Sequence, residues 1–312
     1  MRKIETILVG GMAVLLALSA NAHAQNFALR EMDIHLHAGL ERQAPLDEWI
    51  ALAVADGRKA LLLLDHLELY RMNKKESAKW AREHGGTLLY PMGSEGHRAL
   101  MADFDKAAAA HPELAIFKGW EISEFDFEEG LEEPPIDLAD VVGWHISPNH
   151  DEGPPDGALL IKRIRQIKEV QQRHPIPMIV FHPFTMRIER VLKDAKKAGK
   201  DPASLTTADF RFFKPGEQEE VVRLMKDAPL YIEMALESGD CWDTPAMREA
   251  LIADVKPLAD AGVKFTVSTD NHYLAHAQKP FHPEKYCEPC GITVENANAI
   301  IRELLARKAK TK

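Results

Sequence analysis

Short apolar segments of β type alternate with helical segments along most of this chain. The run Leu61 to Leu64, for example, follows a helical stretch with apolar residues Trp49, Ile50 and Val54 on one face. This alternation is typical of βα units, whose strands are buried between helices and pair in parallel. No internal repeat, low-complexity linker or change in composition divides the chain. We therefore expect a single α/β domain over residues 25–312 with a mainly parallel sheet.

The expected elements follow from apolar spacing and from glycine and proline at their ends. Expected strands are 27–37, 61–64, 114–119, 139–143, 177–181, 229–234 and 263–267, with a possible extra strand at 87–90. Expected helices are 45–57, 74–83, 96–110, 158–172, 244–262 (with a kink or boundary at Pro257) and one from residue 294. The lysine-rich segment 187–213 has no clear pattern and is interpreted as a lid or an excursion near the site.

Residues 1–24 have the pattern of a secretory signal peptide. Arg2 and Lys3 precede an apolar run from Ile7 to Leu18, and Ala22-His23-Ala24 supplies small residues at a cleavage site. The apolar run is shorter than the roughly 20 residues that span a bilayer. We expect cleavage near Ala24, a periplasmic or secreted protein, and no stable membrane anchor after cleavage.

The net charge makes nucleic acid a poor candidate partner. The whole chain carries a formal charge of −9, and removing Arg2, Lys3 and Glu5 takes away a net +1, which leaves −10. Such a surface repels polyphosphate backbones. Multivalent cations bound in a cleft would reverse the sign locally and allow a small phosphorylated substrate.

The three cysteines are Cys241, Cys287 and Cys290. In an oxidising compartment Cys287 and Cys290 can close a small disulfide, with Cys241 left over or competing as partner. A redox role requires such a pair at the start of a helix after a strand, whereas this pair follows Pro280 and Pro283 in a proline-rich segment. We favour a structural role.

Polar side chains stand where successive apolar runs end. They are His35 and His37, Asp65 and His66, Glu121, His145, His182, and Asp270 and His272. In a parallel α/β barrel the carboxyl ends of the strands converge, so these side chains are expected to meet. His35 and His37 project from one face of their strand because strand side chains alternate.

Bound cations are the simplest way to keep so many ionisable groups together, since burying each of them alone costs several kcal/mol. Imidazole and carboxylate without thiolate suit Zn, Mn or Fe, and a bridging carboxylate suits two or three ions. The remaining histidines are expected at the surface (His84, His97, His111, His174 and His282) or are unassigned (His150 and His276). The acidic stretch 124–133 is expected to be a solvated loop.

The ordered set of strand ends resembles a known family. The segments that carry the likeness are Asp33-Ile34-His35-Leu36-His37, Leu64-Asp65-His66, Gly119-Trp120-Glu121, Phe181-His182-Pro183 and Ser268-Thr269-Asp270-Asn271-His272. They are similar to the successive motifs of the PHP superfamily, the polymerase and histidinol phosphatase domain. The likeness runs from about Met32 to His272, and the ordered set is more specific than any one motif.

The resemblance implies a distorted, seven-stranded (β/α) TIM-like barrel with a di- or trinuclear metal centre and phosphoesterase activity. It implies that His35, His37, Glu121 and Asp270 hold one part of the cluster, that His66, His145, His182 and His272 complete it, and that Asp65 orients a ligand or bridges. Two features depart from the pattern. Only Glu41 stands where members with three metals carry another His or Asp, and the spacing around His145 is looser than usual.

The expected function is hydrolysis of a small phosphorylated substrate, in which two ions share a water, lower its pKa and generate the attacking hydroxide. Arg187 is the candidate for phosphate recognition, because guanidinium binds phosphate oxygens bidentately. One alternative is an amidohydrolase-type C–N or C–O hydrolase, which typically ends on a single metal-binding Asp, unlike Asp270-Asn271-His272 here. A second alternative is a non-catalytic metal-binding barrel.

Overall fold

The structure is a computed structural model that describes residues 26–40, 44–83, 85–128, 130–146, 155–236, 244–274 and 281–310. Several sequence predictions therefore lie outside the described residues: the signal peptide at 1–24 and the assignments made for Glu41, His84, His150, Cys241 and His276. In the part of the chain that the structure describes, no helix is long and apolar enough to cross a membrane.

Seven parallel strands form one sheet in the order in which they occur along the chain. The strands are β1 (Met32–His37), β2 (Ala60–Leu64), β3 (Ala115–Ile122), β4 (Val141–His145), β5 (Met178–Phe181), β6 (Leu230–Ala235) and β7 (Phe265–Ser268). Five of the six crossovers contain α-helix, which is the usual connection between parallel strands, and the described part of the β3–β4 crossover contains only short 3-10 turns. The seven predicted core strands and their parallel arrangement are confirmed.

The two edge strands approach each other and nearly close the sheet into a barrel. The main-chain N–H of His37 donates to the carbonyl of Asn271 at 3.2 Å, in an isolated parallel bridge between Leu36 and Asn271. The buried Asp33 carboxylate accepts from both the backbone N–H and the hydroxyl of Thr269, at 2.9 and 2.7 Å. These bonds hold the segment after β7 against β1, so the predicted distorted barrel is confirmed.

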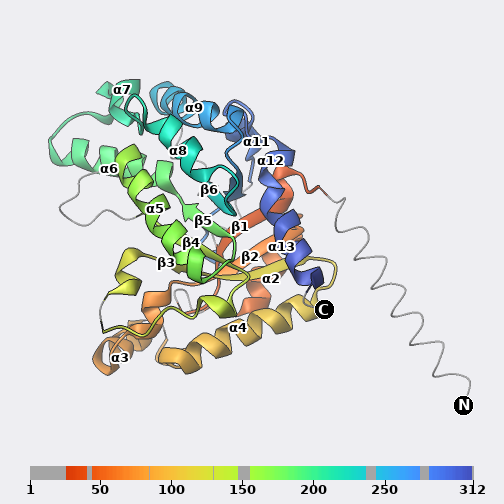
Figure 1. Cartoon of the computed structure of the whole chain (residues 1–312). Coiled ribbons are helices and arrows are strands. Elements are labelled where there is room, and N and C mark those ends of the chain that lie inside the picture. The colour runs from red at the N-terminus through yellow and green to blue at the C-terminus, as the bar shows by residue number, and fades with distance from the viewer. Residues whose placement is uncertain are drawn as a thin grey trace, which may run out of the picture.

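Helices lie around the outside of the strands (Figure 1). They are α2 (Leu46–Ala55), α3 (Lys74–Glu83), α4 (Gly93–Ala110), α5 (Gly157–Arg173), α6 (Pro183–Lys197), α7 (Thr207–Phe210), α8 (Glu217–Met225), α9 (Pro245–Asp260), α11 (Glu284–Cys287), α12 (Val294–Ala297) and α13 (Ala299–Lys310). Short 3-10 turns are η1 (Leu29–Glu31), η2 (Leu67–Arg71), η3 (Glu124–Phe127), η4 (Ile136–Leu138) and η5 (Pro202–Ser204). All of the predicted helices are present, although Pro257 lies inside α9 and does not end it.

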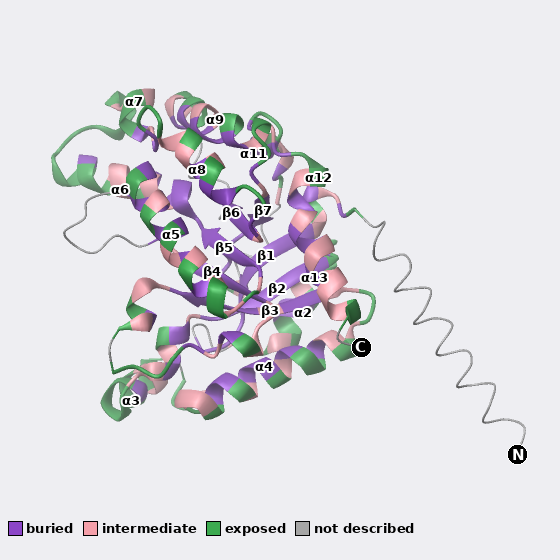
Figure 2. Cartoon of the chain, in the orientation of Figure 1, coloured by how far each residue is buried: buried purple, intermediate pink, exposed green. Residues whose placement is uncertain are grey.

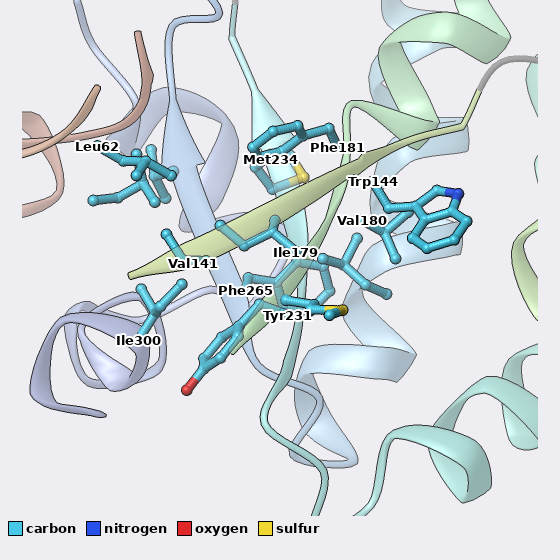
Figure 3. Close-up of a cluster of buried hydrophobic side chains, with 14 of the residues drawn as sticks. Leu62, Val141, Trp144, Ile179, Val180, Phe181, Tyr231, Met234, Phe265 and Ile300 are labelled. Atoms are coloured by element: carbon cyan, nitrogen blue, oxygen red, sulfur yellow. The ribbon is translucent and has the colours of Figure 1, made fainter. Parts of the chain in front are cut away.

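The strands are buried almost completely, while the helices expose one face (Figure 2). Every residue of β1, β2, β5, β6 and β7 is buried. Part of the core is shown in Figure 3, where Val141, Ile179 and Phe265 from three strands gather with Ile300 of α13. Polar side chains on these strands therefore have no bulk water to solvate them.

Two segments differ from the prediction. Residues 87–90 form bends between α3 and α4, so the possible extra strand is wrong. Gly85 and Gly86 before them have φ of 100° and 96°, and Pro91 follows directly, so the backbone turns at both ends of a segment too short to pair. The segment 187–213 is mainly ordered secondary structure: α6 covers its first part, and η5 and α7 follow.

Cys287 and Cys290 are free, buried thiols, so the disulfide that the sequence allows between them is not formed in this structure. Cys287 is the last residue of α11, and the N–H of Cys290 donates to its carbonyl at 3.1 Å. Both side chains pack into the apolar core. Burial raises the pKa of Cys287 well above its usual range and that of Cys290 to about 12. The pair is structural, as predicted, but as packed thiols.

Candidate metal centre

The polar residues predicted at the strand ends meet at one end of the barrel. His35 and His37 lie on β1 and are fully buried. Glu121 lies within β3, His145 ends β4, and His182 follows β5 directly. Three overlapping groups can each hold a metal ion: His37, His66 and His272; His35, His37 and Asp270; and His35, Glu121 and His182.

Four ligand atoms form the innermost part of this cluster. Nε2 of His35 lies 2.9 Å from Nε2 of His37, 3.2 Å from Oδ1 of Asp270 and 3.5 Å from Oε2 of Glu121. Nε2 of His37 lies 3.4 Å from the same Asp270 oxygen and 3.2 Å from the same Glu121 oxygen. The four atoms thus converge from two strands, β1 and β3, and from the segment after β7.

These spacings fit the donor set of a divalent ion. Ligand atoms at about 2.1 Å from a zinc ion are about 3.0 Å apart in octahedral geometry and about 3.4 Å apart in tetrahedral geometry. Oε2 of Glu121 and Oδ1 of Asp270 are buried and accept no hydrogen bond of good geometry from the described residues. Buried carboxylate oxygens rarely lack a donor, and a cation would satisfy both.

Glu121 presents its two oxygens to different histidines. Oε1 lies 2.8 Å from Nδ1 of His145 and 3.1 Å from Nε2 of His182. Oε2 faces His35 and His37, and lies 3.3 Å from Nδ1 of His66. Glu121 therefore lies between two groups of histidines and could contribute one oxygen to each.

His66 and His272 form the outer, partly exposed side of the cluster. Each side chain is 18% exposed, and the ring of His37 stacks against both, with centroids 4.6 Å and 4.0 Å away. Nδ1 of His272 lies 3.7 Å from Oδ1 of Asp270. A third ion in this group would be held by His66, His272 and the shared His37. The further ligand predicted for it, Glu41, lies outside the described residues, so the third ion stays a prediction.

Two of the predicted ligands have left-handed backbone conformations. His182 has φ 35° and ψ 40°, and Asp270 has φ 52°. Non-glycine residues in this region cost about 1 to 3 kcal/mol each and tend to occur at functional sites. Pro183 begins α6 directly after His182, so the chain turns sharply there and the imidazole reaches back to Glu121.

The histidines and carboxylates of the cluster shift each other's pKa values toward the charged forms. Burial lowers the pKa of His35, but Glu233, Asp270 and Glu121 outweigh this effect and hold that pKa well above its ordinary value. Burial raises the pKa of Glu121, but the neighbouring histidines outweigh it and hold that pKa well below the usual range. The Asp270 carboxyl has a lowered pKa for the same reason, chiefly through His35. The site can therefore hold anionic carboxylates beside cations.

Asp65, predicted to orient a ligand or bridge, orients the chain around the cluster. Its Oδ2 accepts from the N–H of Leu40 at 2.6 Å and from the hydroxyl of Tyr70 at 2.8 Å, and its Oδ1 accepts from the N–H of His66 at 2.9 Å. These three donors reach both oxygens, so Asp65 fixes the loops after β1 and β2; a role in orienting a ligand or in bridging stays a prediction.

Arg187, predicted to bind phosphate, is not brought to the cluster. It lies on α6, where its guanidinium donates to the carbonyls of Pro155 and Asp209 at 3.4 and 3.2 Å. Its side chain lines a small cavity with Phe184 and Phe212. No contact joins Arg187 to the cluster in the described residues, so its role in phosphate binding stays a prediction.

Two surface predictions are also wrong. His97 on α4 is only 3% exposed and packs against Tyr70 and Trp120, with ring centroids 5.5 and 5.2 Å away. The acidic stretch is partly structural, because Asp126 is buried and accepts from Arg71 at 2.8 Å. His97 lies on the buried face of α4, and Asp126 is buried in the turn η3. Neither burial could be predicted from the local composition of the sequence.

Glu233 is a residue of the cluster that the strand-end pattern missed. It lies inside β6, is fully buried, and its Oε1 is 2.7 Å from Nδ1 of His35. The available signal was a carboxylate in the middle of the apolar segment Pro229 to Met234. A charged residue on a strand buried on both faces requires a partner, so this position pointed to a polar site.

A cleft leads from the surface to the cluster. It has a volume of about 230 Å³ and is lined by His66, Glu68, Glu121, Ile122, Ser123, Phe125 and His145. Phe125 is 44% exposed at its rim. A small substrate entering here would meet His66, His145 and Glu121 directly.

No family model matches the sequence, and no curated protein matches it. The fold is similar to that of a histidinol phosphate phosphatase from Lactococcus lactis subsp. lactis, which was solved in complex with zinc, L-histidinol and phosphate. The two sequences are 12% identical, the TM-score is 0.48, and the match covers 89% of this chain and 94% of that chain. It is also similar to an Agrobacterium tumefaciens protein solved in the apo form, at 12% identity and a TM-score of 0.39, over 88% of this chain and 95% of that one. Both are similarities of fold only, at 12% sequence identity.

Proposed function

We propose that this chain is a metal-dependent phosphoesterase of the PHP type that hydrolyses a small phosphorylated substrate. The observation that carries the proposal is Glu121, whose Oε2 faces His35 and His37 while its Oε1 faces His145 and His182. A carboxylate shared in this way suits two ions held side by side, the arrangement that serves phosphoryl transfer. The order of the sequence motifs supports the same assignment.

The cluster supplies the ligands for two or three ions, with Zn, Mn or Fe as the matching metals. His35, His37, Asp270 and Glu121 would hold one ion, and Glu121, His145 and His182 a second. His66 and His272 would contribute to a third. When bound, such ions lower the pKa of water and neutralise charge on phosphoryl oxygens.

The residues of the chain do the positioning. The buried strands hold His35 and His37 rigidly, and the strained turns place His182 and Asp270 opposite them. The cleft beside His66 and His145 admits the substrate from one side, and its apolar residues Ile122 and Phe125 exclude water from part of the wall. Because the Arg187 guanidinium contacts the carbonyls of Pro155 and Asp209 and not the cluster, we propose that the cluster itself recognises the phosphoryl group.

The experiment is metal analysis followed by a substrate panel. The mature protein is purified without added metal, its metal content is measured by elemental analysis, and it is then tested with Zn or Mn on phosphomonoesters, phosphodiesters, amides and lactones. Hydrolysis of a phosphoester by a protein with two or more ions bound supports the proposal. Hydrolysis of amides or lactones alone favours the amidohydrolase alternative, and a loaded but inert protein favours a non-catalytic barrel.

We also propose that the protein is exported, because residues 1–24 combine a basic start, an apolar run and the small residues of Ala22-His23-Ala24. Sequencing the N-terminus of the protein from fractionated bacteria tests this. A mature chain that begins near Gln25 in the periplasm or medium supports export, whereas an intact Met1 in the cytoplasm contradicts it.

A further inference from the structure

Glu233 joins three elements of the barrel through one buried carboxylate. Its Oε1 is 2.7 Å from Nδ1 of His35 on β1 and 2.5 Å from the hydroxyl of Ser268 on β7. Its Oε2 accepts from the backbone N–H of His182 at 2.7 Å. Glu233 itself is 0% exposed in β6, so these donors replace the water that a carboxylate normally binds.

The contact with His35 decides which ring nitrogen faces the cluster. A carboxylate accepts hydrogen bonds and does not donate them, so the hydrogen of the neutral imidazole lies on Nδ1. The lone pair is then on Nε2, the atom that lies within 3.5 Å of His37, Asp270 and Glu121. Glu233 thereby presents His35 as a ligand.

The contact with His182 acts on the backbone. His182 has φ 35°, and its N–H would lack a partner in this turn without Oε2 of Glu233. Holding the amide fixes the strained residue and keeps its Nε2 3.1 Å from Oε1 of Glu121. The two oxygens of Glu233 thus support two different halves of the cluster.

We infer that Glu233 is a positioning residue that fixes both halves of the metal centre at once, an inference that rests on the proposed function. The negative charge also raises the basicity of His35 as a ligand, as carboxylates behind metal-binding histidines do. Loss of Glu233 should therefore weaken the binding of more than one ion, although Glu233 contacts none of them.

The first test is Glu233→Gln. The amide keeps one oxygen for His35 but its nitrogen cannot accept from the His182 N–H. We expect the variant to fold, as judged by circular dichroism and thermal unfolding, and to bind zinc about 10- to 100-fold more weakly in competition with a chromogenic chelator. The matched control is Asp254→Asn, which removes another buried carboxylate that accepts from Arg211 and Phe212 at 2.7 Å, away from the cluster. The control should lose stability and keep the zinc affinity of the wild type.

The second test needs no variant at Glu233 and covers the case in which Glu233→Gln does not fold. Nitrogen NMR of the histidine side chains in the zinc-loaded wild type, with the His35 signals assigned by their loss in His35→Gln, reports which nitrogen carries hydrogen. We expect hydrogen on Nδ1 of His35. Hydrogen on Nε2, or a folded Glu233→Gln with unchanged zinc affinity, overturns the inference alone. A wild type that binds no zinc, manganese or iron overturns the proposed function as well.

Discussion

The ring of Phe181 stacks on the imidazole of His35, with ring centroids 3.8 Å apart. Phe181 is the last residue of β5 and is fully buried, and Gly143 of β4 lies against its ring with no room for a side chain. A Cβ on Gly143 would overlap the Phe181 ring. The core of the barrel therefore sets the position of a predicted metal ligand through Phe181.

Gly143→Ala should disturb the metal centre without touching it. The added methyl forces Phe181 toward His35, and overpacking of this kind costs about 1 to 3 kcal/mol of unfolding free energy. We expect that loss in urea denaturation together with weaker zinc binding. Gly57→Ala is the control, because its added Cβ would contact nothing. An alanine at the φ of 78° there should lower the free energy of unfolding by about 1 kcal/mol and leave zinc binding unchanged. A Gly143→Ala protein with the zinc affinity of the wild type would contradict the coupling between Phe181 and His35.

Glu121→Gln should remove metal from both halves of the cluster. The substitution keeps the shape of the side chain but removes the charge that faces His35 and His37 on one side and His145 and His182 on the other. We expect elemental analysis to show less than one ion per chain and phosphoesterase activity to fall by at least about 100-fold. Glu113→Gln, at an exposed turn, is the control and should match the wild type. Full occupancy in Glu121→Gln would show that Glu121 is not shared between ions.

The sequence predicted most of this centre because its ligands obey a simple rule: each stands where an apolar strand ends, and parallel strands end together. His35, Glu121 and Asp270 were found in this way, although their role as ligands remains a prediction. Glu233 lies as far from the end of β6 as His35 lies from the end of β1, but it escaped because its role depends on a contact with His35, which is 198 residues away in sequence. The contacts of Arg187 with Pro155 and Asp209 could not be predicted, because its position depends on the turn at His182, which no local pattern reveals.

Arg187→Ala should reduce stability and leave substrate binding unchanged. The guanidinium holds the carbonyls of Pro155 and Asp209, so its removal should cost about 1 to 2 kcal/mol of unfolding free energy. The KM for a phosphoester should match that of the wild type, because Arg187 does not reach the cluster. Arg190→Ala on the same helix, which removes an ion pair with Asp194, is the control and should change stability by less than about 0.5 kcal/mol. A raised KM with unchanged stability would restore Arg187 as a phosphate ligand.

His97 should make the zinc-free protein less stable in acid. Burial, with a smaller effect from Arg71, lowers the pKa of this imidazole from 6.5 to about 4. In the unfolded chain His97 binds a proton at about pH 6.5, but in the folded chain it does so only near pH 4. The unfolded state is therefore protonated first as the pH falls, and the free energy of unfolding decreases between pH 6.5 and 4. The contribution amounts to about 3 kcal/mol at 1.36 kcal/mol per pKa unit. His97→Leu has no imidazole to bind the proton. Between pH 6.5 and 4 its free energy of unfolding, measured by urea denaturation, should therefore decrease by about 3 kcal/mol less than that of the wild type. Parallel pH profiles for the two proteins would mean that His97 is protonated in the folded state despite its burial.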